Sequence, residues 1–280
     1  MKFLIALSLL ICIASAFKIR GSRNTQPEHL GSMVQKAVVS SRIANAQPAA
    51  PNRIPYQARL FIYHGSGGRC TGCGGSLISN EWVLTAASCT STAEWVMLYL
   101  GGIARSDPST EVSVDTSKII NHPEFDRQSF RNNIALIRIP AVTPSAAIRA
   151  VSLPKRAPHY DTYENQCAVA YGWGRTSDTA KGYSPVLLFA DFIVISNEKC
   201  LGLYDDIDAE HICAVGAISG VGVCDGDFGG PLVIPSNNEI IQIGIISFKS
   251  TKGYESNEPS GFTRVTSYLD WIADETKLSF

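Results

Sequence analysis

Imidazole and thiol groups are the side chains of this sequence best suited to acid–base, nucleophilic or metal chemistry. The 280 residues include five histidines, His29, His64, His122, His159 and His211, together with eight cysteines. A metal site needs His, Cys, Asp or Glu ligands at short, characteristic spacings, and no group of these residues has such a spacing. The sequence therefore predicts neither a metal nor a cofactor, and leaves single histidines as candidates for acid–base chemistry.

The amino-terminal residues predict the environment in which the cysteines react. Lys2 precedes an apolar run over residues 3–13, and small residues follow at positions 14–16. This pattern is typical of a signal peptide, here residues 1–16 with cleavage after Ala16, although a buried amino-terminal helix is the alternative. The predicted localisation is secreted and extracellular, where disulfides form. Loss of Cys12 leaves seven cysteines, so at least one thiol is free or joined to another molecule.

Composition and charge limit the classes of partner. Hydrophobic residues make up 45% of the chain and charged residues 18%, which is enough apolar material for a large core. The net charge is −1, whereas binding to nucleic acid or an anionic membrane requires a basic excess. No apolar run of about 20 residues follows the amino terminus, so no membrane-spanning helix is expected.

Short apolar runs broken by turn residues indicate the elements that must position any site. They cover residues 60–63, 95–100, 134–139 and 240–248, a spacing that favours an all-β barrel or sandwich. The carboxyl end differs, because apolar residues at helical spacing predict an amphipathic helix over residues 267–277. Ser267 and Asp270 resemble a capping box at its start.

Seven segments, in chain order, carry a family resemblance. A polar stretch over residues 17–42 has the composition of a propeptide, and the first segment lies at its end. The segments are Arg42-Ile43, Cys73-Gly-Gly-Ser-Leu-Ile, Trp82-Val-Leu-Thr-Ala-Ala-Ser-Cys89, Asn132-Asn133-Ile-Ala-Leu-Ile, Gly172-Trp-Gly174, Cys224-Asp-Gly-Asp-Phe-Gly-Gly-Pro-Leu232 and Pro259-Ser-Gly-Phe-Thr-Arg-Val265. Together they resemble the chymotrypsin/trypsin-like (S1) serine proteases, and particularly the insect digestive members.

The resemblance implies a fold and a domain organisation. The family folds as two six-stranded antiparallel β-barrels with a carboxyl-terminal α-helix, and its active cleft lies between the barrels. The trypsin-like domain would cover residues 43–280, with the first barrel near residues 43–145 and the second near 146–265.

The same motifs imply a degenerate catalytic triad. The reaction requires a hydroxyl nucleophile, an imidazole base and a carboxylate that orients the base. By resemblance, Ser88 stands at the histidine position, Asn133 at the aspartate position and Phe228 at the serine position. None of the three can act as the group it replaces, so the sequence predicts no catalytic residue. A displaced triad built around another histidine is the alternative.

The resemblance also assigns remnants of the activation and recognition machinery. Cleavage between Arg42 and Ile43 would free an amino terminus whose partner is Asp227, and Gly226 would outline the oxyanion hole. The specificity pocket would have Gly222 at its floor and Lys249 on its wall, and Ser260 would replace a small pocket glycine. Whether the pocket is remodelled for a new ligand or has drifted stays open.

Positions within the family imply the disulfides Cys73–Cys89 and Cys200–Cys213. Cys70, Cys167 and Cys224 have no family partner here, which predicts one new bridge and one free thiol among the three and leaves the pairing open.

Together these features predict a secreted, catalytically inactive serine protease homologue that binds extracellular proteins, with a disulfide-linked partner as a further option. The alternatives are a serine endopeptidase with residual or unconventional activity, and a structural or carrier protein.

Overall fold

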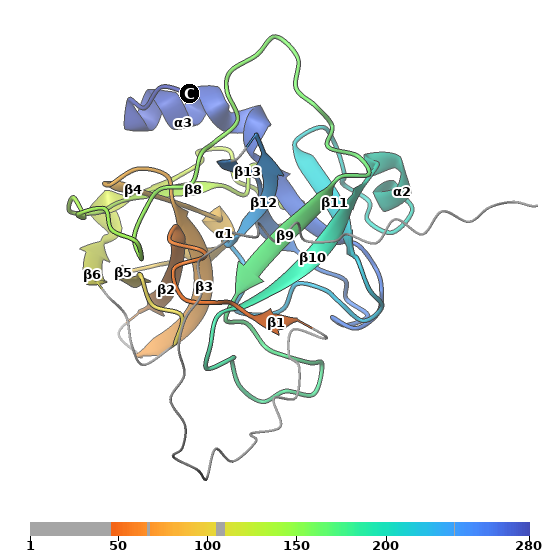
Figure 1. Ribbon diagram of the computed structural model, residues 1–280, viewed down its shortest axis with the longest axis horizontal. Helices are drawn as coiled ribbons and strands as arrows, with labels where there is room; N and C mark the ends of the chain where they lie inside the picture. The colour runs from red at the N-terminus through yellow and green to blue at the C-terminus, as the bar shows by residue number, and fades with distance from the viewer. Residues whose placement is uncertain (1–45, 66–67, 105–109, 238) are drawn as a thin grey trace, which may run out of the picture. The chain divides into compact units, whose positions relative to one another are not determined.

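The computed structural model describes residues 46–65, 68–104, 110–237 and 239–280. Two antiparallel sheets of seven strands each dominate these residues, which confirms the all-β prediction (Figure 1). The first sheet comprises β2 (Gln57–His64), β3 (Arg69–Leu77), β4 (Trp82–Thr85), β5 (Trp95–Leu100), β6 (Thr110–Asp115), β7 (Ile119–Asn121) and β8 (Ala135–Arg138). The second comprises β1 (Gln47–Pro48), β9 (Cys167–Gly172), β10 (Leu188–Ile195), β11 (His211–Gly216), β12 (Pro231–Ser236), β13 (Glu239–Phe248) and β14 (Ser260–Arg264). The α-helices are α1 (Ala87–Thr90), α2 (Asn197–Leu201) and α3 (Leu269–Thr276).

Alternating side chains build the interior of the first barrel. On β2, Leu60 and Ile62 are completely buried, and they lie opposite Leu98 and Val96 of β5, which are buried as well. Side chains two residues apart on a strand point to the same face, so the apolar set of each strand meets the apolar set of its neighbour. The short apolar runs of the sequence therefore supply the buried side chains of one core.

Each sheet has seven strands, one more than the six per barrel that the resemblance implies, and in each sheet one local feature accounts for the extra strand. In the first sheet, β6 and β7 are parts of one segment, interrupted by a 3₁₀ turn at Thr116–Lys118; β6 pairs with β5, and β7 pairs with β8. In the second sheet, β9 pairs with β10 and closes a ring of six strands, to which β1 is added at β10. Residues 47–48 therefore belong to the second barrel rather than the first.

The two barrels share a core and contact each other closely. Val233 and Ile245 of the second barrel pack within the same apolar cluster as the first-barrel residues. The Gly74 N–H donates to the Phe228 carbonyl at 2.7 Å, and a Cβ atom at Gly74 would lie 2.8 Å from the Cα of Gly230. Only glycine allows the backbones of the two barrels to approach this closely, at the place where the candidate site lies.

The carboxyl-terminal helix is shorter than the sequence predicts. A 3₁₀ turn covers Val265–Tyr268 and α3 follows, with Leu269 and Ile272 buried in the shared core. The predicted capping box is wrong: α3 has no side-chain cap, and the Ser267 hydroxyl lies 3.4 Å from the Ala209 carbonyl instead. Among the described residues, no helix combines the length and the apolar character needed to cross a bilayer.

Candidate functional site

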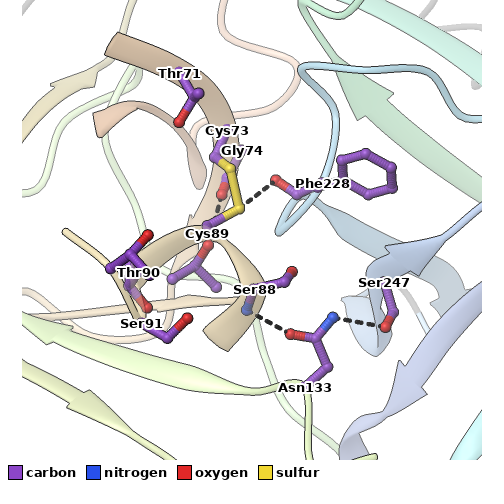
Figure 2. Close-up of a disulfide and its surroundings, with 12 residues drawn as sticks. Thr71, Cys73, Gly74, Ser88, Cys89, Thr90, Ser91, Asn133, Phe228 and Ser247 are labelled. Atoms are coloured by element: carbon purple, nitrogen blue, oxygen red, sulfur yellow. Dashed lines mark hydrogen bonds between the residues drawn. A yellow bond between two sulfur atoms is a disulfide. The ribbon is translucent and has the colours of Figure 1, made fainter. Parts of the chain in front are cut away.

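Three elements bring Ser88, Asn133 and Ser247 together in a hydrogen-bonded row (Figure 2). Asn133, which lies before β8, is fully buried; its Oδ1 accepts the Ser88 N–H at 2.7 Å, and its Nδ2 donates to Ser247 Oγ at 2.8 Å. The Thr263 hydroxyl donates to the Asn133 carbonyl at 2.9 Å. Hydroxyl and amide side chains do not titrate near neutral pH, so this row is polar, uncharged and unable to accept a proton.

Phe228 lies on the loop before β12, close to the row. Its main chain is held by the hydrogen bond from Gly74 and lies 3.5 Å from Cys89 Sγ, whereas its ring points away from the disulfide (Figure 2). The half-buried ring packs against the cores of both barrels and lines the cleft between them. An aromatic ring therefore occupies the position to which the motif assigns a nucleophile.

Asp227 is buried beside Phe228 and is held by main-chain groups. Its carboxylate accepts the Gly174 N–H at 2.7 Å and the Cys224 N–H at 3.0 Å. A Cβ atom at Gly172 would lie 1.8 Å from Asp227 Oδ1, so the carboxylate fits only against glycine. Burial raises the pKa of Asp227 to about 7, with a smaller contribution from Asp225. The predicted partner Ile43, like Arg42, lies outside the described residues.

Gly226 has a φ of +98°, which glycine adopts without strain. The exposed ring of Tyr183 lies over it, because a Cβ atom there would be 2.8 Å from that ring. The space next to the predicted oxyanion-hole remnant is therefore partly covered.

Of the three residues predicted for the specificity pocket, only Lys249 lines the cleft. Gly222 and Ser260 are buried and take no part in the lining. The main-chain oxygen of Tyr254 would lie 2.5 Å from a Cβ atom at Gly222, while the hydroxyl of the same Tyr254 donates to Asp225 Oδ2 at 2.6 Å. Tyr254 thus extends from the expected floor to the wall of the cleft. No sequence pattern predicts this contact, because the residues lie about 30 positions apart.

Lys249, Asp225 and Tyr254 form a charged cluster at the cleft, which Lys249 and Asp225 line. Lys249 Nζ lies 2.9 Å from Asp225 Oδ1 and 4.0 Å from the centre of the Tyr254 ring. Burial alone would lower the pKa of Lys249, but hydrogen bonds to Asp225 and Tyr254 outweigh it and raise that pKa. Burial would raise the pKa of Asp225, but hydrogen bonds from Tyr254 and Lys249 outweigh it and lower that pKa. Both groups stay ionised at neutral pH and hold each other in place.

The cleft in front of these groups has a volume of about 720 Å³ and contains one histidine. His64 Nε2 lies 2.8 Å from the Thr71 hydroxyl, and its Nδ1 lies 3.0 Å from the Thr92 carbonyl. The turn-like residues beside His64 favour a solvated histidine, and the contact with Thr71 arises only from the pairing of β2 with β3. In the described part of the chain, no three His, Cys, Asp or Glu residues are close enough to hold a metal ion.

The structure contains both disulfides implied by the family positions. Cys73–Cys89 joins β3 to α1 next to the site, and Cys200–Cys213 joins α2 to β11. The expected bridge among Cys70, Cys167 and Cys224 is not formed: Cys70 and Cys224 are free, and Cys167 is disulfide-bonded. Cys70 is exposed on the first barrel and Cys224 is buried in the second, so their positions on different barrels keep them apart.

The two free thiols are expected to react at different rates. Burial raises the pKa of Cys224 far above its usual value, so its thiolate is scarce as well as inaccessible. Titration of the native full-length chain, from which residues 1–16 have not been removed, with an aromatic disulfide reagent should show one fast thiol, which Cys70→Ser removes, and a second only on unfolding, which Cys224→Ser removes. A fast phase that survives Cys70→Ser would contradict this assignment.

Comparisons with known proteins agree with the fold. The family model described as Trypsin matches residues 43–272. A collagenase of Hypoderma lineatum is 36% identical over the full length of both chains, and brachyurin of Leptuca pugilator is 38% identical over 85% of this chain and all of its own. A solved HL collagenase structure superposes with a TM-score of 0.77 at 36% identity, covering 84% of this chain and 99% of its own. The motifs, the two barrels and these matches lead to one conclusion: the chain belongs to the trypsin family of serine proteases.

Proposed function

We propose that this protein is a secreted, non-catalytic member of the trypsin family that binds other proteins through the cleft between its barrels. The observation that carries the proposal is the meeting of Ser88, Asn133 and Phe228 at one place, at the positions where the motifs require histidine, aspartate and serine. The predicted signal peptide (residues 1–16) and propeptide (17–42) belong to the same proposal, with 43–280 as the functional domain.

The chemistry of the three side chains supports a loss of hydrolysis. Peptide cleavage needs a nucleophile that a neighbouring base deprotonates. Phe228 has no nucleophilic atom, Ser88 cannot act as a base, and neutral Asn133 could not stabilise an imidazolium. Removing such a triad lowers turnover by roughly a millionfold.

The burial of Gly222 and Ser260 away from the cleft also supports the proposal. A substrate side chain must enter a pocket before the scissile bond is positioned. The main-chain oxygen of Tyr254 lies against Gly222, its hydroxyl donates to Asp225, and Lys249 pairs with the same Asp225. A ligand would therefore rest on the cleft wall without inserting a side chain beside Gly222.

A second candidate, an unconventional endopeptidase, is supported by one contact and by the relatives. The imidazole of His64 could accept the proton of the Thr71 hydroxyl at 2.8 Å, with Nδ1 oriented by the Thr92 carbonyl. The relative from Hypoderma lineatum is named a collagenase, and one from Drosophila melanogaster, 37% identical, is named a serine protease. The contact also has a structural explanation, because it bridges neighbouring strands of a hairpin.

Labelling with a fluorophosphonate probe separates the two candidates. The full chain, before and after cleavage following Arg42, should take up no probe, while an active trypsin in the same tube becomes labelled. Stoichiometric labelling would overturn the non-catalytic proposal. Loss of that labelling in Thr71→Val, with its retention in Thr90→Val, would establish the second candidate, because Thr90 lies off the lining of the cleft.

A further inference from the structure

Cationic side chains from both barrels line the cleft. Arg69 begins β3, Arg127 lies between β7 and β8, Arg175 follows β9 and Lys249 follows β13. Among the described residues that line this cleft, Asp225 is the only one with a carboxylate, and it is already paired with Lys249. The whole chain has a net charge of −1, so this local excess does not reflect a generally basic protein.

Arg69 and Arg127 keep their charge available to a ligand, whereas Arg175 is close enough to Asp225 to help lower the pKa of that carboxyl. Within the described residues, no ion pair involves Arg69, Arg127 or Arg175. Arg127 Nη2 donates to the neutral hydroxyl of Ser91 at 2.6 Å, which fixes the guanidinium but does not neutralise it. Arg69 and Arg127 are exposed, and Arg175 is partly exposed. A guanidinium that is ordered but unpaired is suited to bind a carboxylate with two hydrogen bonds.

Aromatic rings supply the apolar part of the same cleft. Phe130 and Phe248 lie 6.1 Å apart between ring centres, and both line the cleft together with Tyr183 and Phe228. Phe248 is fixed from behind by Tyr204, whose ring centre is 5.1 Å away. Such a surface can bury one apolar side chain while the arginines contact charges on either side of it.

We propose that this cleft binds an acidic segment of a partner polypeptide, with its Asp or Glu side chains on Arg69, Arg127 and Arg175 and an apolar side chain against Phe130 and Phe248. The inference rests on the proposed non-catalytic function and names its class of ligand. Opposite charge speeds association and excludes basic partners.

The chain's own predicted propeptide does not fit as the occupant. Residues 17–42 contain five basic residues and one acidic residue, so they would be repelled by the cleft. A nucleic acid or a sulfated polysaccharide is disfavoured, because such ligands are bound by basic stripes on proteins with a basic excess, whereas this chain has a pI near 6.5.

Peptide binding to the full-length protein tests the proposal by fluorescence anisotropy. The probe is a fluorescein-labelled peptide with two Glu residues on each side of one Phe, and its matched control has Gln in place of every Glu. We expect binding of the Glu peptide that weakens at least tenfold between 50 and 300 mM salt, and at least tenfold weaker binding of the Gln peptide. Equal affinity for both peptides would overturn the proposal.

Charge reversal in the protein locates the site. Arg127→Glu and Arg69→Glu should each weaken binding of the Glu peptide at least tenfold, whereas Arg149→Glu, an exposed arginine outside the cleft lining, should change it less than twofold. Equal losses in all three variants would overturn the site. Heparin or single-stranded DNA that binds more tightly than the peptide, and loses affinity with Arg127→Glu, would overturn the choice of a polypeptide.

Mass spectrometry of the same mixtures keeps the two proposals separate. A peptide that is bound and stays intact supports both. A peptide that is cleaved overturns the non-catalytic function, and one that stays intact but unbound overturns only the acidic ligand.

Discussion

A variant that combines Ser88→His, Asn133→Asp and Phe228→Ser is expected to stay at least about a hundredfold below an active relative in kcat/KM for peptide esters. The unmodified protein should lie roughly a millionfold below that relative, because nucleophile and base are both missing. The triple variant restores the chemical groups but not the room for a substrate.

The expected shortfall follows from the contacts of Tyr254 and Lys249. The main-chain oxygen of Tyr254 lies against Gly222, its hydroxyl donates to Asp225, and Lys249 lies over its ring. Misplacing reacting atoms by about 1 Å lowers the rate by roughly a hundredfold. Adding Lys249→Gly should remove the ion pair to Asp225 and raise kcat/KM by about a further tenfold.

The control for this series is Lys249→Gly alone, which should show no activity above the unmodified protein. Steady-state hydrolysis of a panel of peptide esters provides the measurement. Activity of the triple variant equal to that of the relative would show that the cleft accepts substrates in the manner of a protease. In that case a decoy that captures protease substrates would replace the acidic-segment ligand.

The stability of the uncleaved protein is expected to fall by up to about 4 kcal/mol as the pH rises from 4 to 7, through the ionisation of Asp227 alone. Burial raises the pKa of this carboxyl from 3.8 to about 7 in the folded protein. The folded state therefore binds the proton more tightly than the unfolded state does. The stabilisation is complete below pH 4 and is lost by the time the pH passes the folded pKa. A tenfold difference in proton affinity between the two states corresponds to about 1.4 kcal/mol.

Urea unfolding at several pH values, compared with Asp227→Asn, isolates this effect. The variant cannot titrate and keeps one acceptor for the Gly174 and Cys224 N–H groups, so it should be less stable than the unmodified protein at pH 4 and should gain on it by about 4 kcal/mol by pH 8. Asp274→Asn, at an exposed position of α3, should leave the pH dependence almost unchanged.

The same urea unfolding at several pH values can be carried out on protein cleaved after Arg42. An amino terminus at Ile43 that reaches Asp227 would lower the carboxyl pKa, remove the loss of stability between pH 4 and 7, and raise the melting temperature. Equal pH profiles before and after cleavage would show that the activation contact is vestigial. Equal profiles of the unmodified protein and Asp227→Asn would show that Asp227 does not titrate in this range.

The sequence by itself determined the class of fold, and its motifs predicted which residues stand at the three triad positions. The alternation of apolar residues on strands and the short motifs around Ser88, Asn133 and Phe228 each involve residues that are neighbours in the sequence. They can therefore be recognised without the tertiary structure. The disulfides Cys73–Cys89 and Cys200–Cys213 were implied by the family resemblance, and the structure contains both.

Only the tertiary structure decided which side chains lie against the predicted specificity pocket and which charged groups line the cleft. The contact of Tyr254 with Asp225 joins residues 29 positions apart, and that of Tyr254 with Asp178 joins residues 76 apart. Arg69 and Arg175 meet in one cleft because strands of different barrels end there, and no periodicity along the chain encodes that meeting. Local patterns determine which face of a strand is buried, but contacts between loops depend on how two closed barrels pack together.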